Sequence, residues 1–576
     1  MRSIAAFLAV ILSFSVRISA AEKPGTSAAG QAQFDGLVES YFDLYFRFHP
    51  TAGTSAGFHQ YDSQLEDFSR DGVAAEVSAW KAFLPQLEAV DASTLDTISA
   101  GDFAFLHSQI QSRLFELETV RSWEKDPDPY ASGPAYSIYL LMKRNFAPPE
   151  ERLRSVVSRE KQIPSTLSAA RHNLSDPPRV FTEVALEQLP GTIDFFRKDI
   201  AEAFRTVTDP KLRSEFEASN RAAVEALQKY QNFLEQDLLP ISKGDFRLGA
   251  ENFRKKLLYD EMVDIPLDRL REIGYADLHR NQEQLKQTAG QIDPQHGVRQ
   301  VMANLQNDHP APDRLLQSFR DVLFSLRQFI EAHKIVTLPS QAEPVVEETP
   351  PFARALTTAA METPGPYETR DTKGIFQVTL PEPGWKPEQI EEWMREFPRG
   401  TIVSTSVHEV YPGHFVQYLW SLKAPSKVRK LLYCNSNAEG WAHYSEQMML
   451  DEGYSNDPRI RLGQIQDALL RDARFVVGIE MHTGKMTLAE AEKFFVEEGY
   501  QVPPIAKVEA RRGTSDPTYL VYTLGKLQIM KLRADYQQAK GVKFNLQEFH
   551  DRFLEQGGLP IKLIRQAMLG DDGTTL

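Results

Sequence analysis

The sequence predicts a mainly α-helical protein with one small β element, and three observations support this fold class. Apolar residues recur at spacings of three and four over most of the 576 residues, as on the buried face of amphipathic helices. One short segment, residues 374–380, instead alternates and carries β-branched residues, which is typical of a strand. The chain has no repeat of fixed period, so a solenoid is not expected.

The N-terminal half of the chain is predicted to be a succession of helices. Phe34, Tyr41 and Tyr45 belong to the first apolar stripe, and Pro50 ends that helix because its ring does not fit a helix interior. Further helices are predicted over residues 73–87, 98–117, 149–174, 180–207, 210–239, 267–289 and 313–333.

The character of the chain changes near residue 335. Residues 339–351 are proline-rich and extended, and the strand at 374–380 follows them. Helices resume at residues 387–397 and continue from residue 401 to the C-terminus. We therefore expect one large domain over residues 34–576, divided into an N-terminal helical part (34–334) and a second part (335–576).

The first 21 residues are typical of a secretory signal peptide. Arg2 gives a positive start, residues 4–14 form an apolar run too short to span a bilayer, and Ser19-Ala20-Ala21 offers small residues for cleavage. A membrane anchor is the alternative, which Arg17 disfavours because it interrupts the apolar run. Residues 22–33 are expected to be flexible. The protein is therefore expected to be periplasmic or secreted.

Composition narrows the environment and the partners. The formal net charge of −14 argues against a nucleic-acid partner, which would require a basic face. No later segment reaches transmembrane length, so no integral membrane segment is expected after signal removal. The single cysteine, Cys434, excludes an internal disulfide and a lipobox. We expect it to be a small buried residue, with a catalytic thiol as the alternative.

The most informative motif lies at residues 407–417. His408-Glu409 precedes His414 by six residues, whereas zinc hydrolases commonly use H-E-x-x-H. In an unbroken helix His414 would lie about 240° around the axis from His408. Pro412 must break the helix, and Gly413 can adopt conformations closed to other residues. The break either excludes a shared metal or returns His414 to His408, and the sequence leaves both outcomes open.

A second stretch could supply a further ligand. Glu439, His443 and Glu446 lie at i, i+4 and i+7, on one helical face. Thermolysin-like zinc enzymes take a Glu from the next helix as third ligand, which leaves one coordination position open. The alternative is an exposed acidic helix face.

A third stretch, residues 509–526, combines two arginines with two tyrosines. Arg511 or Arg512 could pair with a substrate carboxylate, and the hydroxyl of Tyr519 or Tyr522 could donate to a developing oxyanion. From spacing alone, the simpler interpretation is favoured: core aromatic residues and solvated arginines.

These three stretches together resemble the signature blocks of the domain-of-unknown-function 885 family, bacterial proteins similar to zincin-type metallopeptidases. The blocks read HEVYPGHFVQ, AEGWAHYSEQMMLDEGY and RRGTSDPTYLVYTLGKLQIMKLR. Shorter matching blocks at residues 50–54, 549–551 and 556–560 extend the resemblance over nearly all of the mature chain. The resemblance implies a large helical, zincin-like body that encloses a cleft, similar to the thimet-oligopeptidase and carboxypeptidase Taq groups.

The resemblance also implies roles for individual residues. His408, His414 and Glu439 would bind one zinc ion per chain, and Glu409 would be the general base. Tyr522 would face the substrate.

Other implied roles are carried by residues outside the metal ligand set. Arg511, Arg512 and Tyr519 would contact the substrate. His482 would be catalytic, but where family members have an Asp this chain has Gly478, so Glu480 would have to support that histidine. His443 is not counted as a ligand.

We therefore expect an exported zinc-dependent metallohydrolase that cleaves short peptides with a metal-activated water. The alternatives are a zinc amidase or esterase acting on small substrates, and a catalytically silent binding protein that keeps the fold. His and carboxylate ligands also suit manganese and cobalt. The strand at 374–380 is expected either to bind a peptide at a sheet edge or to form a small structural hairpin.

Overall fold

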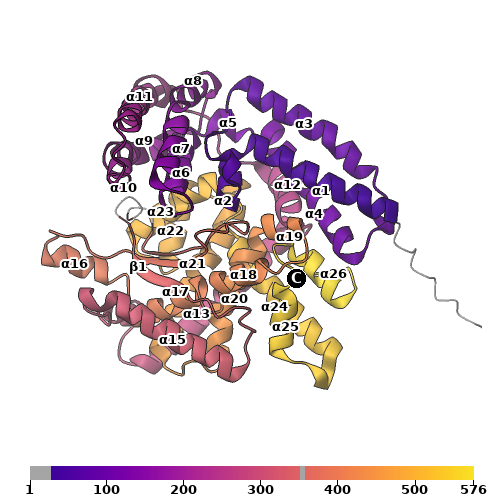
Figure 1. Cartoon of the computed structure of the whole chain (residues 1–576). Helices are drawn as coiled ribbons and strands as arrows, with labels where there is room; N and C mark the ends of the chain where they lie inside the picture. Colours follow the sequence, from indigo (N-terminus) through magenta and orange to yellow (C-terminus); the bar gives the residue numbers. More distant parts are fainter. Residues whose placement is uncertain (1–27, 351–353, 355–356) are drawn as a thin grey trace, which may run out of the picture.

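The computed structural model describes residues 28–350, 354 and 357–576 as a body of packed helices with one small sheet (Figure 1). The predicted signal peptide, residues 1–21, lies outside the described residues, as do residues 22–27 of the segment predicted to be flexible. Along the described chain, every helix is too short or too polar to cross a lipid bilayer.

The first helices form the indigo layer of Figure 1. These are α1 (Ala28–Phe48), α2 (Pro50–Ala56), α3 (Arg70–Glu88) and α4 (Thr97–Phe115). The prediction that residues 22–33 are flexible is wrong for residues 28–33, which form the first turns of α1. Alanine and glutamine favour helix, and the Gln31 side chain donates a 2.8 Å hydrogen bond to Ser99 of α4.

A second group of helices builds its own hydrophobic core. It contains α6 (Pro129–Met142), α7 (Pro149–Glu160), α8 (Ile163–Asn173), α9 (Arg179–Asp194) and α11 (Pro210–Phe233). Tyr130, Leu153 and Phe196 are among the side chains buried between them. The largest core, in contrast, joins residues of both predicted parts, including Trp80 from the first part and Trp441 from the second.

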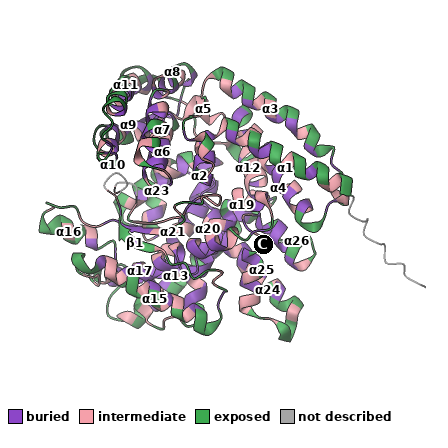
Figure 2. Ribbon diagram, viewed as in Figure 1, coloured by how far each residue is buried: buried purple, intermediate pink, exposed green. Residues whose placement is uncertain are grey.

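Helices with many buried side chains lie at the centre of the molecule (Figure 2). They are α13 (Leu267–Ile292), α17 (Arg399–Glu409), α20 (Asn435–Asp451), α21 (Pro458–His482) and α24 (Val521–Lys540). α20 lies along α24, and α13 lies along α21. The α20–α24 approach requires glycine on both helices, because a Cβ on Gly440 would lie 2.5 Å from the Cα of Gly525.

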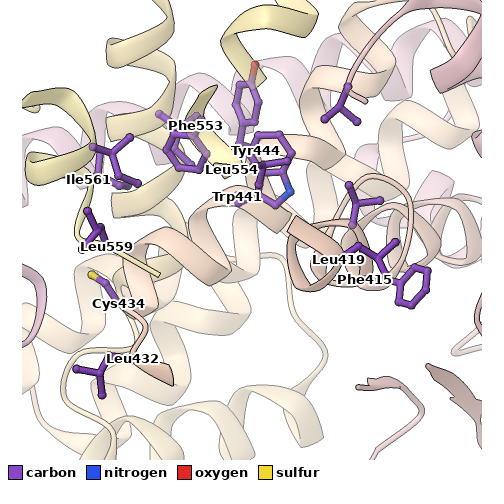
Figure 3. Packing of buried hydrophobic residues seen from close by; sticks show 14 of the residues in the cluster. Phe415, Leu419, Leu432, Cys434, Trp441, Tyr444, Phe553, Leu554, Leu559 and Ile561 are labelled. Atoms are coloured by element: carbon purple, nitrogen blue, oxygen red, sulfur yellow. The ribbon is translucent and has the colours of Figure 1, made fainter. Parts of the chain in front are cut away.

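The far side of α20 packs against C-terminal helices, including α25 (Leu546–Leu554) and α26 (Ile561–Leu569). Figure 3 shows Trp441 and Tyr444 of α20 beside Phe553 and Leu554. Cys434, just before α20, is 1% exposed and so is buried as predicted. Packing on both faces fixes α20, which carries Glu439.

The remaining α-helices are shorter or peripheral. They are α5 (Ser122–Lys125), α10 (Ile200–Ala203), α12 (Gly249–Glu261), α14 (Val298–Leu305), α15 (Leu315–His333), α16 (Pro387–Met394), α18 (His414–Ser421), α19 (Lys427–Leu431), α22 (Leu488–Glu497) and α23 (Pro503–Ser515).

The small sheet has three strands in the order β1-β3-β2: β1 (Val345–Glu348), β2 (Ala359–Glu362) and β3 (Ile375–Val378). β3 pairs parallel with β1 and antiparallel with β2. The predicted strand is therefore confirmed, but the expectation that it forms a sheet edge is wrong, because both of its sides are paired. The hairpin alternative also fails, since β3 is the centre of a three-stranded sheet. The strand that lies at an edge beside α17 is β2.

Candidate metal centre

The helix carrying His408 ends before the proline, as predicted. α17 ends at Glu409, and α18 begins at His414. The Tyr411–Pro412 peptide bond is cis. Gly413 donates a 3.0 Å hydrogen bond to the carbonyl of Val407, and a Cβ on Gly413 would lie 1.8 Å from the carbonyl oxygen of His408. The φ angle of Gly413 is negative, so a left-handed backbone is not the reason for glycine here. Glycine is required because of the close approach to His408.

The break returns His414 to His408, and Glu439 of α20 meets both histidines. Glu439 Oε2 lies 3.4 Å from His408 Nε2 and 3.5 Å from His414 Nε2. The three ligand atoms all lie within 4.8 Å of one another. Atoms about 2.1 Å from a shared tetrahedral ion are separated by about 3.4 Å, so two of these separations match a zinc site directly.

Glu439 fits a metal better than it fits a hydrogen-bond network. Its Oε2 atom is buried and makes no hydrogen bond within the described part of the chain. A buried carboxylate oxygen without a partner is costly in a folded protein. The donor set of two imidazoles and one carboxylate is the set that zinc hydrolases use with one position open. The residues present therefore fit the implied zinc ion.

Glu446 and Arg471 contact His408 at Nδ1, the ring nitrogen that faces away from Glu439. Nδ1 of His408 lies 2.7 Å from Glu446 Oε1, and Arg471 lies 3.0 Å from the same oxygen. Burial lowers the pKa of His408, but the neighbouring carboxylates of Glu439 and Glu446 outweigh it and raise this pKa to about 10. A carboxylate on Nδ1 fixes the ring so that Nε2 faces a metal.

His443 contacts the other oxygen of Glu446. Its Nδ1 atom lies 3.2 Å from Glu446 Oε2, and burial lowers the pKa of His443 to about 3. His443 and Glu446 are 0% and 1% exposed, so the alternative of an exposed acidic helix face is wrong. His443 does not belong to the ligand cluster, as expected.

Glu409 lies next to the cluster and is held by the sheet. Its Oε2 atom accepts a 3.0 Å hydrogen bond from the backbone N–H of Met361 in β2. The side chain is half-buried and lines the same cavity as His408. One carboxylate oxygen of Glu409 is thus anchored to β2, at the border of the cavity that His408 also lines.

Tyr522, on the first turn of α24, also reaches this cavity. Its ring centre lies 6.5 Å from that of His408, with nearly parallel planes, and Arg474 lies 5.1 Å over the ring. Burial is the main cause that raises the pKa of Tyr522, so the hydroxyl is a proton donor near neutral pH. Arg512 lines the same cavity and pairs with Asp516 at 3.0 Å.

Three other predicted site residues lie elsewhere, and His482 is the clearest correction. It is 1% exposed, with Nε2 2.8 Å from the carbonyl of Gly513, and burial lowers its pKa to about 4. Glu480 accepts a hydrogen bond from Tyr275 and does not support His482. His482 is eight residues beyond Arg474 on α21, about 12 Å along the axis, so it cannot share the site.

Arg511 and Tyr519 are the other corrections. The Arg511 side chain is largely covered and pairs with Glu187 at 2.8 Å, away from the arginine-lined cavity beside His408. Tyr519 is 1% exposed and fills the space above Gly513, where a Cβ would meet its hydroxyl oxygen at 2.3 Å. The simpler interpretation therefore holds for Tyr519 as a core aromatic residue, but Arg511 is ion-paired and largely covered and is not a solvated arginine.

Sequence reasoning missed the charged residues that α21 presents to the site. Asp467, Arg471 and Arg474 lie at i, i+4 and i+7 and line the cavity beside His408. Charged residues at helical spacing within an otherwise apolar helix were the available signal, because such residues are rarely buried without partners.

Two cavities border the ligand cluster. The first, here the arginine cavity, has a volume of about 390 Å³ and is lined by His408, Glu409, Tyr522, Arg512 and Ala359, among others. The second has a volume of about 720 Å³ and reaches the cluster at His414. We call it the tyrosine cavity, because its lining includes Tyr45, Tyr136, Tyr418 and Tyr433. β2 borders the arginine cavity at Ala359 and the tyrosine cavity at Met361, and residues 363–366 after it line the tyrosine cavity.

Solved structures share this fold. A candidate lipoprotein of unknown function from Shewanella oneidensis is 27% identical with a TM-score of 0.80, and the match covers 93% of this chain and 99% of that one. A candidate lipoprotein from Colwellia psychrerythraea is 19% identical with a TM-score of 0.78, again over 93% and 99% of the two chains, which shows likeness of fold. A comparison with curated proteins finds no match.

The family comparison covers most of the chain. Residues 50–568 match the family described as bacterial protein of unknown function, DUF885. This range contains the three residues of the ligand cluster and the lining residues through which both cavities border that cluster. The chain therefore belongs to the DUF885 family of bacterial proteins.

Proposed function

We propose that this protein is a zinc-dependent metallohydrolase that cleaves short peptides. The observation that carries the proposal is the convergence of His408, His414 and Glu439, with the Glu409 carboxylate adjacent. Two neutral imidazoles and a carboxylate with an open position, next to a glutamate base, match the requirements of metal-assisted hydrolysis. The proposal includes a zincin-like body in which the two cavities are parts of one substrate cleft.

Each nearby side chain has a role in such a reaction. Zinc at these ligands would polarise the substrate carbonyl and acidify a water molecule. Glu409 would take a proton from the attacking water through the oxygen that Met361 does not hold, and then pass it to the leaving amine. The Tyr522 hydroxyl would donate a hydrogen bond to the developing oxyanion, with its ring held under Arg474.

The sheet offers a way to align a peptide beside these groups. The backbone N–H of Thr379 donates a hydrogen bond to the carbonyl of Thr358. From this pair onward, the residue pairs of the antiparallel β2–β3 ladder alternate between hydrogen-bonded and non-hydrogen-bonded pairs. Ala360 therefore faces β3, and the backbone groups of Ala359 and Met361 face outward. We propose that an extended substrate lies along this outer edge of β2.

An envelope location fits this proposal. The sequence begins with a predicted secretory signal, and both structural relatives are described as candidate lipoproteins. We propose that the protein works in the periplasm or after secretion, with peptides as its substrates.

Metal analysis combined with a peptide library tests the proposed function. The purified protein should hold one zinc ion per chain by elemental mass spectrometry and should hydrolyse members of the library. Glu409→Gln should keep the zinc ion and lose hydrolysis by at least 100-fold. A protein without stoichiometric metal, or a Glu409→Gln variant as active as the wild type, would overturn the proposal.

A further inference from the structure

We propose that the tyrosine cavity is the subsite for an aromatic or large apolar side chain on the acyl side of the cleaved bond. The inference rests on the proposed peptidase function and names the substrate class: peptides with such a residue just before the scissile bond. Nothing in the metal chemistry requires it, since the cavity's tyrosines are distinct from the metal ligands and from Glu409 and Tyr522.

The position of the cavity connects it to the reaction. It is bordered by the metal ligand His414 and by Met361 of β2, whose N–H holds the Glu409 carboxylate. The chain that follows β2, residues 363–366, continues as its wall. A peptide extended along β2 advances about 3.3 Å per residue, so the residue next to the reacting carbonyl already reaches this cavity.

The two cavities would hold the parts of the peptide on opposite sides of the cleaved bond. Glu409 lines the arginine cavity and would pass its proton to the leaving amine. The leaving portion therefore lies in the arginine cavity. The acyl portion then extends past His414 into the tyrosine cavity.

The lining suits an apolar ring. Tyr136 of α6 and Tyr433, just before α20, are 50% and 68% exposed, although large apolar side chains are usually covered. Both line the tyrosine cavity with Tyr45 and Tyr418, so their exposed faces meet in one concave space. Aromatic rings bind other rings edge-on or with offset stacking.

The hydroxyl groups of this lining stay neutral. Burial raises the pKa of Tyr136 and of Tyr433, and the Glu439 carboxylate further raises that of Tyr433. Arg429, a charged residue of the lining, is committed to Asp102 by a 2.7 Å ion pair. The aromatic rings therefore form a large part of the lining, beside charged side chains that include Lys430 and Glu66.

The volume agrees with this role. At about 720 Å³ the cavity is larger than the arginine cavity and falls within the range of sites that enclose small ligands. It can hold one aromatic side chain together with neighbouring residues of a short peptide.

Binding and cleavage of one peptide series test the inference. The series is a blocked alanine pentapeptide in which one phenylalanine is moved through each position. Binding to zinc-loaded Glu409→Gln protein is measured by calorimetry, and wild-type products are mapped by mass spectrometry. Phenylalanine just before the cleaved bond should bind and react roughly tenfold better than alanine there.

Variants of the cavity's tyrosines test whether this cavity causes the phenylalanine preference. Tyr433→Ala and Tyr136→Ala should each reduce the phenylalanine preference at that one position, and Tyr433→Phe should keep it. Phe324→Ala on α15, which removes an aromatic side chain that is 65% exposed outside the cavity, is the matched control and should change nothing.

The outcomes separate this inference from the proposed function. Hydrolysis of the alanine peptides with no phenylalanine preference at any position, or a preference that survives both alanine variants, overturns the subsite and leaves the peptidase standing. Tyr433-dependent binding of phenylalanine peptides without any hydrolysis by the wild type overturns the peptidase and the acyl-side assignment together, and leaves the tyrosine cavity as a binding site for aromatic side chains.

Discussion

The carboxylate of Glu446 lies 2.7 Å from Nδ1 of His408, on the opposite side of the ring from Nε2, which faces Glu439 at 3.4 Å. When a metal displaces the proton from Nε2, this relationship would keep the remaining proton on Nδ1 and direct the Nε2 lone pair toward the ligand cluster. We therefore propose that the zinc affinity of the site depends on Glu446, a residue outside the proposed ligand set.

Glu446→Gln should weaken zinc binding by roughly 10- to 100-fold, because an amide fixes the His408 ring less firmly than a carboxylate. Competition with a chromogenic chelator measures the change. Asp451→Asn, at the exposed end of the same helix, is the control and should bind zinc as the wild type does. Equal zinc affinity in Glu446→Gln and wild type would contradict this role of Glu446.

Gly413→Ala should disrupt the metal centre without unfolding the protein. A Cβ at this position would lie 1.8 Å from the carbonyl oxygen of His408, so the start of α18 and His414 must shift. We expect the bound zinc content to fall below half of one ion per chain, with circular dichroism unchanged.

Gly36→Ala provides the comparison for that substitution. Gly36 lies in α1, and a Cβ there meets nothing within 4 Å. Alanine at this site should stabilise the helix by roughly 0.5–1 kcal/mol and leave zinc binding intact. Full zinc content in Gly413→Ala would show that the close approach is not needed for the site.

Arg512→Ala should weaken hydrolysis of peptides with a free C-terminal carboxylate and spare their amidated forms. Arg512 lines the arginine cavity and is half-exposed there, and arginine pairs well with carboxylates. We expect a rise in KM of roughly tenfold for the free acids.

Arg511→Ala is the natural control, because the neighbouring side chain turns away to Glu187. It should leave the ratio of free-acid to amide hydrolysis unchanged. If Arg511→Ala changed this ratio and Arg512→Ala did not, Arg512 in the arginine cavity would not be the residue that binds the substrate carboxylate.

The convergence of His408, His414 and Glu439 could be predicted because the signals for it are local or repeat at helical spacing. The His408-to-His414 segment contains its own helix breaker, and Glu439 follows on the next long helix. Tyr519 and Tyr522 show the limit of such signals. They are three residues apart, but Tyr519 precedes α24 and is buried, whereas Tyr522 lies on its first turn and reaches the cavity.

The sheet and the supporting charges could not be predicted for a different reason. Residues 359–362 are Ala-Ala-Met-Glu, a composition that favours helix, and they form β2 because β3 pairs with them. Arg471 supports His408 across 63 residues of sequence. Both features depend on contacts between distant segments, which periodicity within one segment does not reveal.

Glu160 should make the stability of the N-terminal helices depend on pH. It is 0% exposed, accepts hydrogen bonds from Ser219 and Asn220, and burial raises its pKa to about 7. In the unfolded chain this pKa lies near 4.3, so the folded state holds the proton more tightly and the protein loses stability as pH rises from about 4.3 to 7.

Glu160→Gln removes this titration and should therefore stabilise the protein above pH 7. At pH 8 the free energy of unfolding in urea should exceed that of the wild type by on the order of 2–3 kcal/mol, and at pH 4 the difference should nearly vanish. Glu151→Gln, on the exposed face of the same helix α7, should show no such pH dependence. A Glu160→Gln effect that is the same at both pH values would mean that Glu160 is already ionised in the folded protein at low pH.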